Sequence, residues 1–388
     1  MRSPALSLRR SASVAAIAIL AAAPVTAASP APATPAPATP ASATPAPAVA
    51  AVPLLGFKPA AASFVSAAWG VVLGGVGCSP AHGCPARLAV TADGGAHWLL
   101  LNPPPARLGG GRPQVSQIVF ASRRNGWLYG QDGRGLWATH DGGTHWRKLS
   151  LGGTIETMAA AAGTAYAVVT PAGGGAGQLL RSPAGRDSWA RVSPVTAGPS
   201  AVLAVSGTAA WLGASAGHGP AGVLWATADG VHWRQQPFRC PGRGYELSGI
   251  AAASRSHVVF LCTNPQGTFH TRKEVLRSAN GGRTEHLAGH PPTAGDTGSG
   301  IAVPPHRSGT ITIAVITPGR DFLDRSADGG KSWSQITAPG TNGGMALNSL
   351  AYQSRTQGWV VAGGPSEGGP QWLLHTSDGG RSWHRVSI

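Results

Sequence analysis

Short apolar runs, many with alternating polar positions, recur along the chain from residue 60 onward, and glycine or other turn residues flank each of them. This alternation is typical of β-strands that bury one face. A second short strand follows each run, and no segment beyond residue 28 has a helical period. The pattern therefore predicts an all-β protein whose strands include residues 126–130, 210–213, 257–261, 310–315 and 358–362.

The second strand of each pair leads into a motif that recurs seven times. Four copies read Thr/Ser-x-Asp-Gly-Gly-x-x-Trp and begin at Thr91, Thr139, Ser326 and Thr376. Three copies are altered: the one at Thr227 is one residue short, the one at Ser278 has Glu285 in place of Trp, and the one at Ser182 has Ala184 in place of Asp. The Asp positions are 48, 43, 45, 51, 48 and 50 residues apart, the length of a four-stranded propeller blade.

The motif has a structural role that its residue types explain. An Asp carboxylate can accept backbone N–H groups across a tight turn, while Gly-Gly supplies positive φ angles and the Ser or Thr hydroxyl adds a local partner. The Trp covers the hairpin with an apolar ring. Because repeats scattered along the chain cannot all line one site, we interpret the motif positions as structural: Asp93, Asp141, Asp229, Asn280, Asp328 and Asp378.

A single blade cannot bury both faces of its twisted sheet, so the blades must pack face to face in a ring. The sequence predicts a seven-bladed β-propeller of four-stranded antiparallel blades over residues 54–388. Residues 384–388 supply the outer strand of the seventh blade, so the ring can close without a swapped strand. Residues 52–57 could still supply one.

The first 28 residues are typical of a secretory signal, with Arg2, Arg9 and Arg10 before an apolar stretch and small residues at its end. Arg9-Arg10 leaves twin-arginine export open beside ordinary secretion. Residues 29–53 are almost wholly Ala, Pro and Thr and predict an extended linker, either a stalk or a disordered tail. We expect a secreted or envelope-associated protein with no transmembrane span in the mature chain.

The exported part contains four cysteines, an even number that favours disulfides in an oxidising compartment. Cys78 and Cys84 bracket a Pro/Gly loop and form the natural first pair, which leaves Cys240 with Cys262. Cys78, His82 and Cys84 could instead bind a metal, but no second ligand pair has zinc-site spacing. We therefore expect two disulfides, no metal and no cofactor.

The formal net charge is +15, and arginine contributes far more of it than lysine. An acidic partner is plausible, although a GC-rich coding bias would enrich Arg together with Ala, Gly and Pro. One arginine recurs in the turn before the second strand of four blades, on the same face as the motif hairpins. These residues are our candidate binding surface for an anionic envelope polymer or a protein partner: Arg123, Arg255, Arg307 and Arg355.

The repeats resemble the Asp-box, or BNR-repeat, β-propeller superfamily from about Ala60 to the end of the chain. In repeat style, with a Gly-Trp strand before the motif, they look most like the photosystem II assembly-factor type and uncharacterised bacterial relatives. The superfamily also includes sialidases and other glycan-cleaving enzymes, so the resemblance implies the fold more strongly than the function.

A sialidase-like site would need an arginine triad, a tyrosine with a nearby glutamate and an acidic acid/base group. Tyr245 and Glu246 are the one tempting pair, but neighbours on a strand point to opposite faces. The carboxylates of Glu156, Asp296, Asp321 and Glu367 lie in expected loops, and nothing pairs them.

We therefore expect a non-catalytic binding or assembly scaffold, with glycoside hydrolysis on the opposite loop face as the alternative. A glycan partner stays possible under both readings. We expect no nucleic-acid partner and a monomer.

Overall fold

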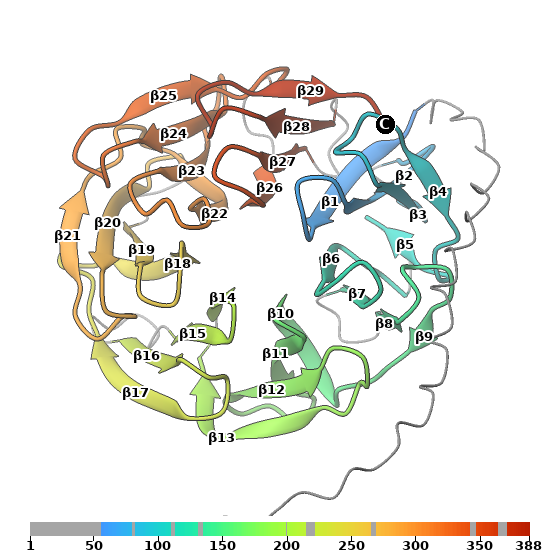
Figure 1. Cartoon of the computed structure of the whole chain (residues 1–388), viewed down its shortest axis with the longest axis horizontal. Coiled ribbons are helices and arrows are strands. Elements are labelled where there is room, and N and C mark those ends of the chain that lie inside the picture. The colour runs from blue at the N-terminus through green and yellow to red at the C-terminus, as the bar shows by residue number, and fades with distance from the viewer. Residues whose placement is uncertain are drawn as a thin grey trace, which may run out of the picture. The chain divides into compact units, whose positions relative to one another are not determined.

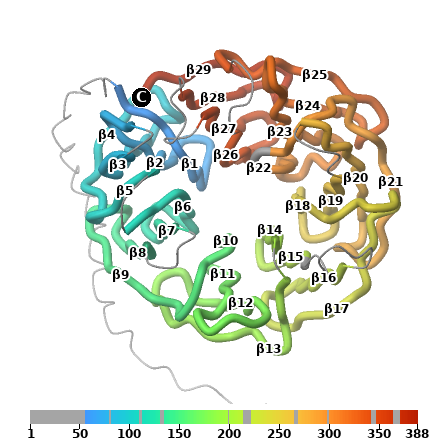
Figure 2. The backbone as a smooth tube through the Cα atoms, turned by 180° about the vertical axis from the view of Figure 1, so that it is seen from behind, coloured from blue at the N-terminus to red at the C-terminus, as the bar shows by residue number. Residues whose placement is uncertain are grey.

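The computed structural model describes residues 56–79, 82–109, 113–130, 135–198, 200–214, 222–264, 269–341, 347–363 and 371–388. In these residues 29 strands form seven antiparallel sheets, and Figures 1 and 2 show the sheets arranged as blades around a central axis. The predicted seven-bladed β-propeller is thus confirmed. The expected signal peptide and the whole of the expected linker, residues 29–53, lie outside the described residues.

Each blade consists of strands that follow one another in the sequence. Blade 1 contains β1 (Lys58–Phe64), β2 (Gly70–Gly75), β3 (Cys84–Thr91) and β4 (Leu99–Leu101), with β5 (Arg107–Leu108) paired to β3. Blade 2 contains β6 (Gln117–Phe120), β7 (Gly126–Tyr129), β8 (Leu136–Thr139) and β9 (Arg147–Lys148). Blade 3 contains β10 (Gly153–Ala161), β11 (Thr164–Pro171), β12 (Gly177–Pro183) and β13 (Ala190–Ala197).

The remaining four blades follow the same order. Blade 4 contains β14 (Val202–Ser206), β15 (Ala209–Ala214), β16 (Gly222–Thr227) and β17 (Trp233–Phe238). Blade 5 contains β18 (Glu246–Ala252), β19 (Val258–Asn264), β20 (Arg272–Ser278) and β21 (His286–Gly289). Blade 6 contains β22 (Asp296–Ala302), β23 (Ile311–Ile316), β24 (Phe322–Ser326) and β25 (Ser334–Thr337). Blade 7 contains β26 (Leu347–Tyr352), β27 (Gly358–Ala362), β28 (Trp372–Thr376) and β29 (His384–Val386).

The first strand of every blade lies nearest the axis and the fourth lies at the periphery (Figure 1). The second strand is almost entirely buried, as in β2 and β7, because both of its faces pack against neighbouring sheets. The core therefore consists of apolar layers between blades. Aromatic pairs such as Trp69 with Phe120 and Phe238 with Phe260, whose ring centroids are 5.2 and 4.9 Å apart, bridge adjacent sheets.

The ring closes by face-to-face packing of blade 1 on blade 7. The ring of Phe64 stacks on Trp359 at 4.2 Å with an interplanar angle of 4°, and the Ala62 N–H donates to Ser349 Oγ at 3.0 Å. Phe57 joins the same buried cluster from outside any strand. Within the described residues all four strands of blade 7 come from the C-terminal end of the chain, so no strand is swapped.

Both predicted disulfides are present, one in blade 1 and one between blades 4 and 5. Cys78 bonds to Cys84, and Cys240 bonds to Cys262. Among the residues that the structure describes, no helix has the length and apolarity needed to cross a membrane.

Candidate functional site

Each motif builds a hydrogen-bonded hairpin between the third and fourth strands of its blade. In blade 2 the Thr139 hydroxyl donates to Asp141 Oδ1 at 2.9 Å and accepts from the Gly143 N–H at 2.8 Å. Asp141 Oδ1 also accepts the N–H groups of Thr144 and His145, each at 3.0 Å. The φ angle of Gly143 is 95°, which few residues other than glycine adopt. The Asp141 carboxylate therefore stabilises the turn of its own hairpin.

The same contacts recur around the ring and keep the aspartates ionised. The His97 N–H is the main reason that the pKa of Asp93 falls to about 2. Burial opposes the same shift at Asp378, yet the Ser382 hydroxyl and N–H lower its pKa to about 2 as well. The pKa values of the corresponding aspartates in blades 2, 4 and 6 are lowered too: Asp141, Asp229 and Asp328. Every one of these carboxylates is held within its own hairpin.

In two altered motifs another residue occupies the Asp position of the turn. In blade 5 Asn280 Oδ1 takes the place of a carboxylate oxygen and accepts from the Ser278 hydroxyl at 2.9 Å and the Thr284 N–H at 3.0 Å. The hairpin therefore keeps its shape without a negative charge. In blade 3 Ala184 occupies the position, and Asp187, three residues later, points into the junction with blade 2 instead.

Asp187 is a cross-link between blades that the sequence did not reveal. Its side chain is fully buried, at 0% exposure, and accepts from Trp127 Nε1 at 3.1 Å and from Arg147 at 2.9 Å. His140 Nε2 lies 2.8 Å from Asp187 Oδ2, the carboxylate oxygen that Arg147 also contacts. The three partners all belong to blade 2, so one carboxylate ties two sheets together.

Other hairpins also accept hydrogen bonds from the preceding blade. Trp211 Nε1 of blade 4 donates to the Gly281 carbonyl of blade 5 at 2.9 Å. Arg325 Nε of blade 6 donates to the Gly379 carbonyl of blade 7 at 2.7 Å. The hairpin face is therefore a rigid frame in which turns and neighbouring blades position one another.

The four candidate arginines lie on this hairpin face. In blade 2 the Gly142 N–H of the motif donates to the Arg124 carbonyl of the first turn at 2.9 Å, and equivalent bonds join Gly281 to Ser256 and Gly379 to Thr356. Three of the candidate side chains are exposed and that of Arg307, which lies beside Gly379, is half-buried. The arginines belong to blades 2, 5, 6 and 7: Arg123, Arg255, Arg307 and Arg355.

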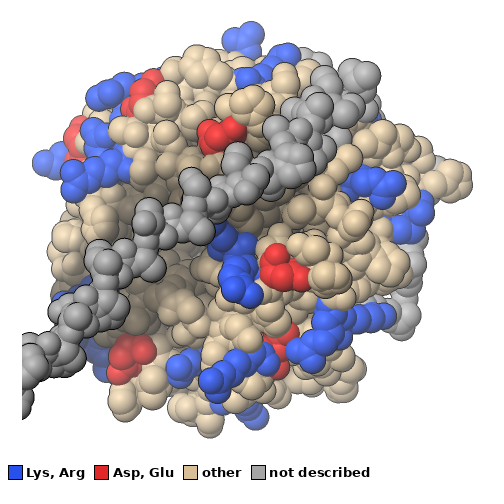
Figure 3. Space-filling view, turned by 45° about the vertical axis from the view of Figure 1, so that its right-hand side comes forward, with Lys and Arg blue, Asp and Glu red and all other residues tan. Residues whose placement is uncertain are grey.

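Basic side chains also dominate over acidic ones on the wider surface seen in Figure 3. These basic side chains have fixed relative positions only where they project from turns that hydrogen bonds hold in place. The hairpin face meets that condition, because its turns are held by the hydrogen bonds described above.

On the loop face Tyr245 lies close to Glu274. Glu274 Oε2 accepts the Gly242 N–H at 3.0 Å, which commits that oxygen to the loop. Partial burial, and then the charge of Glu274, raise the pKa of Tyr245 above its ordinary value. The glutamate beside Tyr245 is therefore Glu274, which is 29 residues away in the sequence.

The other candidate carboxylates do not converge. Glu156 and Asp296 lie within β10 and at the start of β22, so the expectation that they occupy loops is wrong. Glu156 accepts the Thr170 hydroxyl at 2.9 Å, and Asp296 accepts the Phe269 N–H at 3.2 Å. Asp321 is buried just before β24, and Glu367 lies outside the described residues.

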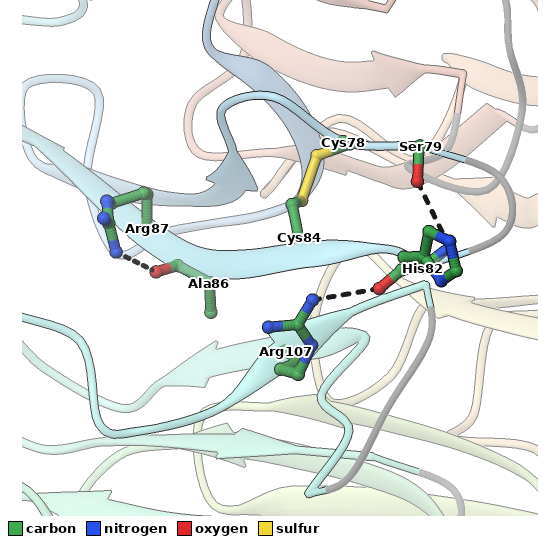
Figure 4. Close-up of a disulfide and its surroundings, with 7 residues drawn as sticks. All are labelled: Cys78, Ser79, His82, Cys84, Ala86, Arg87 and Arg107. Atoms are coloured by element: carbon green, nitrogen blue, oxygen red, sulfur yellow. Dashed lines mark hydrogen bonds between the residues drawn. A yellow bond between two sulfur atoms is a disulfide. The ribbon is translucent and has the colours of Figure 1, made fainter.

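The cysteine loop of blade 1 offers no metal site. Figure 4 shows Cys78 and Cys84 bonded to each other, so neither sulfur is a free thiolate ligand. The backbone N–H of His82 donates to Ser79 Oγ at 3.1 Å. The backbone carbonyl of His82 accepts from the Arg107 guanidinium at 3.0 Å. No group of three or more metal-ligating side chains occurs in the described part of the chain.

Five clefts on the described residues have volumes of about 310 to 630 Å³. None of these five is lined by two carboxylates. One includes Asp141, which its own hairpin holds, and another, between blades 4 and 5, is lined by three arginines.

The comparisons with known proteins agree with this geometry. Residues 315–388 match the family model of the photosynthesis system II assembly factor YCF48. YCF48 from Cyanidioschyzon merolae is similar over 84% of this chain and 97% of its own, with 16% identity and a TM-score of 0.56. This chain is a seven-bladed β-propeller whose residues 315–388 match a BNR-repeat family model.

Two further structures share this fold. The structure of YCF48 bound to a D1 peptide is similar over 83% of this chain and 92% of its own, with 16% identity and a TM-score of 0.54. Hydrazine synthase of Kuenenia stuttgartiensis covers 83% and 96%, at 9% identity and a TM-score of 0.55. A search of curated proteins gave no significant match. The resemblance in repeat style to the photosystem II assembly-factor type is thus confirmed, and these low identities establish the shared fold alone.

Proposed function

We propose that this chain is an exported, non-catalytic binding propeller that holds an acidic polypeptide segment against its hairpin face. The observation that carries the proposal is the set of exposed arginines on rigid turns of that face. Arg123, Arg255 and Arg355 have no hydrogen bond or ion pair from their guanidinium groups to another described residue. They are therefore available to a partner.

The aspartates of the same face do not cancel this availability. Each motif carboxylate accepts several donors within its own hairpin, as the four contacts of Asp141 illustrate. Guanidinium groups bind carboxylates through paired N–H donors, so a segment rich in Asp and Glu suits a surface with spaced arginines. The similar structure of YCF48 bound to a D1 peptide supports a polypeptide as the partner class.

Export is the second part of the proposal. The signal-like residues 1–28 and the Ala/Pro/Thr-rich residues 29–53 support it, as do the two disulfides, because such bonds persist in oxidising compartments. Locating the protein by fractionating cells that express the full chain tests this part separately from binding.

Binding is tested with fluorescent peptides of equal length, one rich in Asp and Glu and one rich in Lys. We expect the acidic peptide to bind the wild type and to weaken as salt rises, since exposed charge pairs are screened. A variant with all four candidate arginines changed to glutamine should bind it roughly tenfold or more weakly.

A matched control replaces four exposed arginines of the loop face with glutamine: Arg239, Arg243, Arg272 and Arg320. It removes the same net charge and should retain most of the binding. Equal loss in both variants would show a general charge effect, and unchanged binding in the first would contradict the proposal.

A further inference from the structure

A cleft of about 310 Å³ opens on the hairpin face at the junction of blades 4 and 5. Blade 4 contributes Trp211 from β15, the end of β16 and Arg234 from β17. Blade 5 contributes Arg255 and Ser256 from the turn between β18 and β19, and the motif hairpin between β20 and β21. Two blades thus form its opposite walls.

Three guanidinium groups line this cleft, and no carboxylate does. Arg234, Arg255 and Arg283 are exposed, and among the described residues none of their side chains has a hydrogen bond or ion pair. The nearest acids in the sequence are Asp229, whose carboxylate pairs with His232 at 2.7 Å, and Glu285. Neither of these two acids lines the cleft.

The altered motif of blade 5 explains why the cleft lacks negative charge. Asn280 lines the cleft at the position that is Asp in five other hairpins. Its amide keeps the turn through the contacts with Ser278 and Thr284, so the substitution removes a charge and leaves the shape intact. An aspartate at this position would face the three arginines.

The frame that carries these arginines is fixed. Trp211 Nε1 holds the Gly281 carbonyl at 2.9 Å, and the Gly281 N–H holds the Ser256 carbonyl at 2.8 Å. These bonds join the two blades and the turn that carries Arg255. A ligand here would order three side chains but no backbone, which keeps the entropic cost of binding low.

We propose that this cleft binds a phosphate monoester. A phosphoryl group presents three terminal oxygens and about two negative charges at neutral pH, which match three guanidinium groups better than the two oxygens and single charge of a carboxylate. The cleft has about ten times the volume that one water molecule occupies in the liquid, so it also admits the esterified group.

The cleft overlaps the acidic-segment surface at Arg255. Arg234 and Arg283 do not belong to that surface, and binding of a phosphate monoester is measured without any peptide. Failure of one proposal therefore leaves the other to be decided by its own experiment.

The test is isothermal titration calorimetry of the full propeller with phenyl phosphate, inorganic phosphate and acetate at pH 7.5. We expect phenyl phosphate to bind with saturable heat and acetate to bind at least tenfold more weakly. The double variant Arg234→Gln, Arg283→Gln should lose at least tenfold in affinity, and Arg272→Gln, Arg320→Gln on the loop face should lose none.

The variant Asn280→Asp tests the electrostatic argument without removing an arginine. It restores the residue of five other hairpins, so we expect it to fold with an unchanged or higher melting temperature and to bind phenyl phosphate at least tenfold more weakly. Absence of saturable heat in the wild type, equal affinity for acetate, or full binding in the double variant would each overturn the proposal.

Discussion

Trp127 Nε1 donates a hydrogen bond of 3.1 Å to the carboxylate of Asp187, so that the second strand of blade 2 is tied to the hairpin of blade 3. Blade 3 is the blade whose motif has lost its own aspartate, at Ala184. The carboxylate that remains in this hairpin serves the junction between blades instead of the turn. Loss of the local contact and gain of the long-range one occur in the same hairpin.

Replacing Asp187 with alanine should destabilise the propeller by about 1 to 3 kcal/mol, because it leaves Trp127 Nε1 without its partner and removes the acceptor that Arg147 and His140 share. Urea unfolding followed by tryptophan fluorescence measures the change. The control Arg147→Gln removes a partner whose side chain is 65% exposed and should cost less than about 1 kcal/mol. Equal costs would show that the carboxylate acts only through Arg147.

Stability should decrease in acid because the motif carboxylates have lowered pKa values in the folded state. Their contribution is complete above the ordinary carboxyl pKa of 3.8 and is lost as the pH falls toward about 2, the value for Asp93 and Asp378. Burial raises the pKa of Asp324, which acts in the opposite sense. Melting temperatures measured between pH 2 and 7 should show the net fall.

The variant Asp328→Asn isolates one of these titrations. Asparagine keeps the oxygen that accepts the Ser332 N–H at 2.9 Å, as Asn280 does in blade 5, but cannot ionise. We expect a shallower dependence of the melting temperature on pH in this variant than in the wild type. Identical slopes would show that the Asp328 carboxylate does not contribute to acid unfolding.

The buried hydroxyl of the motif should matter more than the exposed one beside it. Thr139→Val leaves the Gly143 N–H and one side of Asp141 without their partner and should cost about 1 to 3 kcal/mol. Thr144→Val removes an exposed hydroxyl that donates to the Asp141 carbonyl at 3.3 Å and should cost less than about 0.5 kcal/mol. Chemical denaturation of the two variants compares them directly, and a reversed order would contradict the hairpin account.

Packing at the ring closure should be as costly to remove as packing in any other core layer. Trp359→Ala deletes a fully buried ring that stacks on Phe64 and should cost about 3 to 5 kcal/mol. The half-buried Trp372, which stacks on Arg385 at 4.1 Å, provides the control and should cost clearly less as alanine. A small effect of Trp359→Ala in thermal unfolding would mean that the first and last blades separate without loss of stability.

The disulfide that closes the longer loop should contribute more to stability, because the entropy of loop closure grows with the logarithm of loop length. Cys240 and Cys262 are 22 residues apart and should contribute about 3 kcal/mol, whereas Cys78 and Cys84 are 6 apart and should contribute about 2 kcal/mol. Paired Cys→Ala variants measured by urea unfolding test this order. A larger loss from the shorter loop would contradict an account based on the unfolded chain.

Much of the fold could be predicted because its information is local and repeated. The number and spacing of the motifs predicted the number of blades. The apolar runs before each motif predicted which strands precede the hairpin in each blade. The exact partners of Asp187 could not be predicted, since Trp127 is 60 residues away and nothing in the sequence relates them. Only a three-dimensional ring brings such positions together.

The candidate site was predictable in part for the same reason. The turn arginines follow from the repeat, and the structure places them on the hairpin face. Glu274 beside Tyr245, and the grouping of Arg234 with Arg255 and Arg283, depend on how one sheet packs on another. The sequence signal for this cleft was Asn280, which replaces the Asp of five other motifs and lies in the wall of the cleft.

The closure of the ring through the contact of Phe64 with Trp359 has a consequence for how the molecule can be rearranged. Since every sheet is a continuous stretch of chain, joining the present ends and cutting a connection between any two blades leaves each sheet whole. Circularly permuted forms should therefore fold into the same seven-bladed propeller. Permutation is more disruptive in a propeller where one sheet combines strands from both ends of the chain.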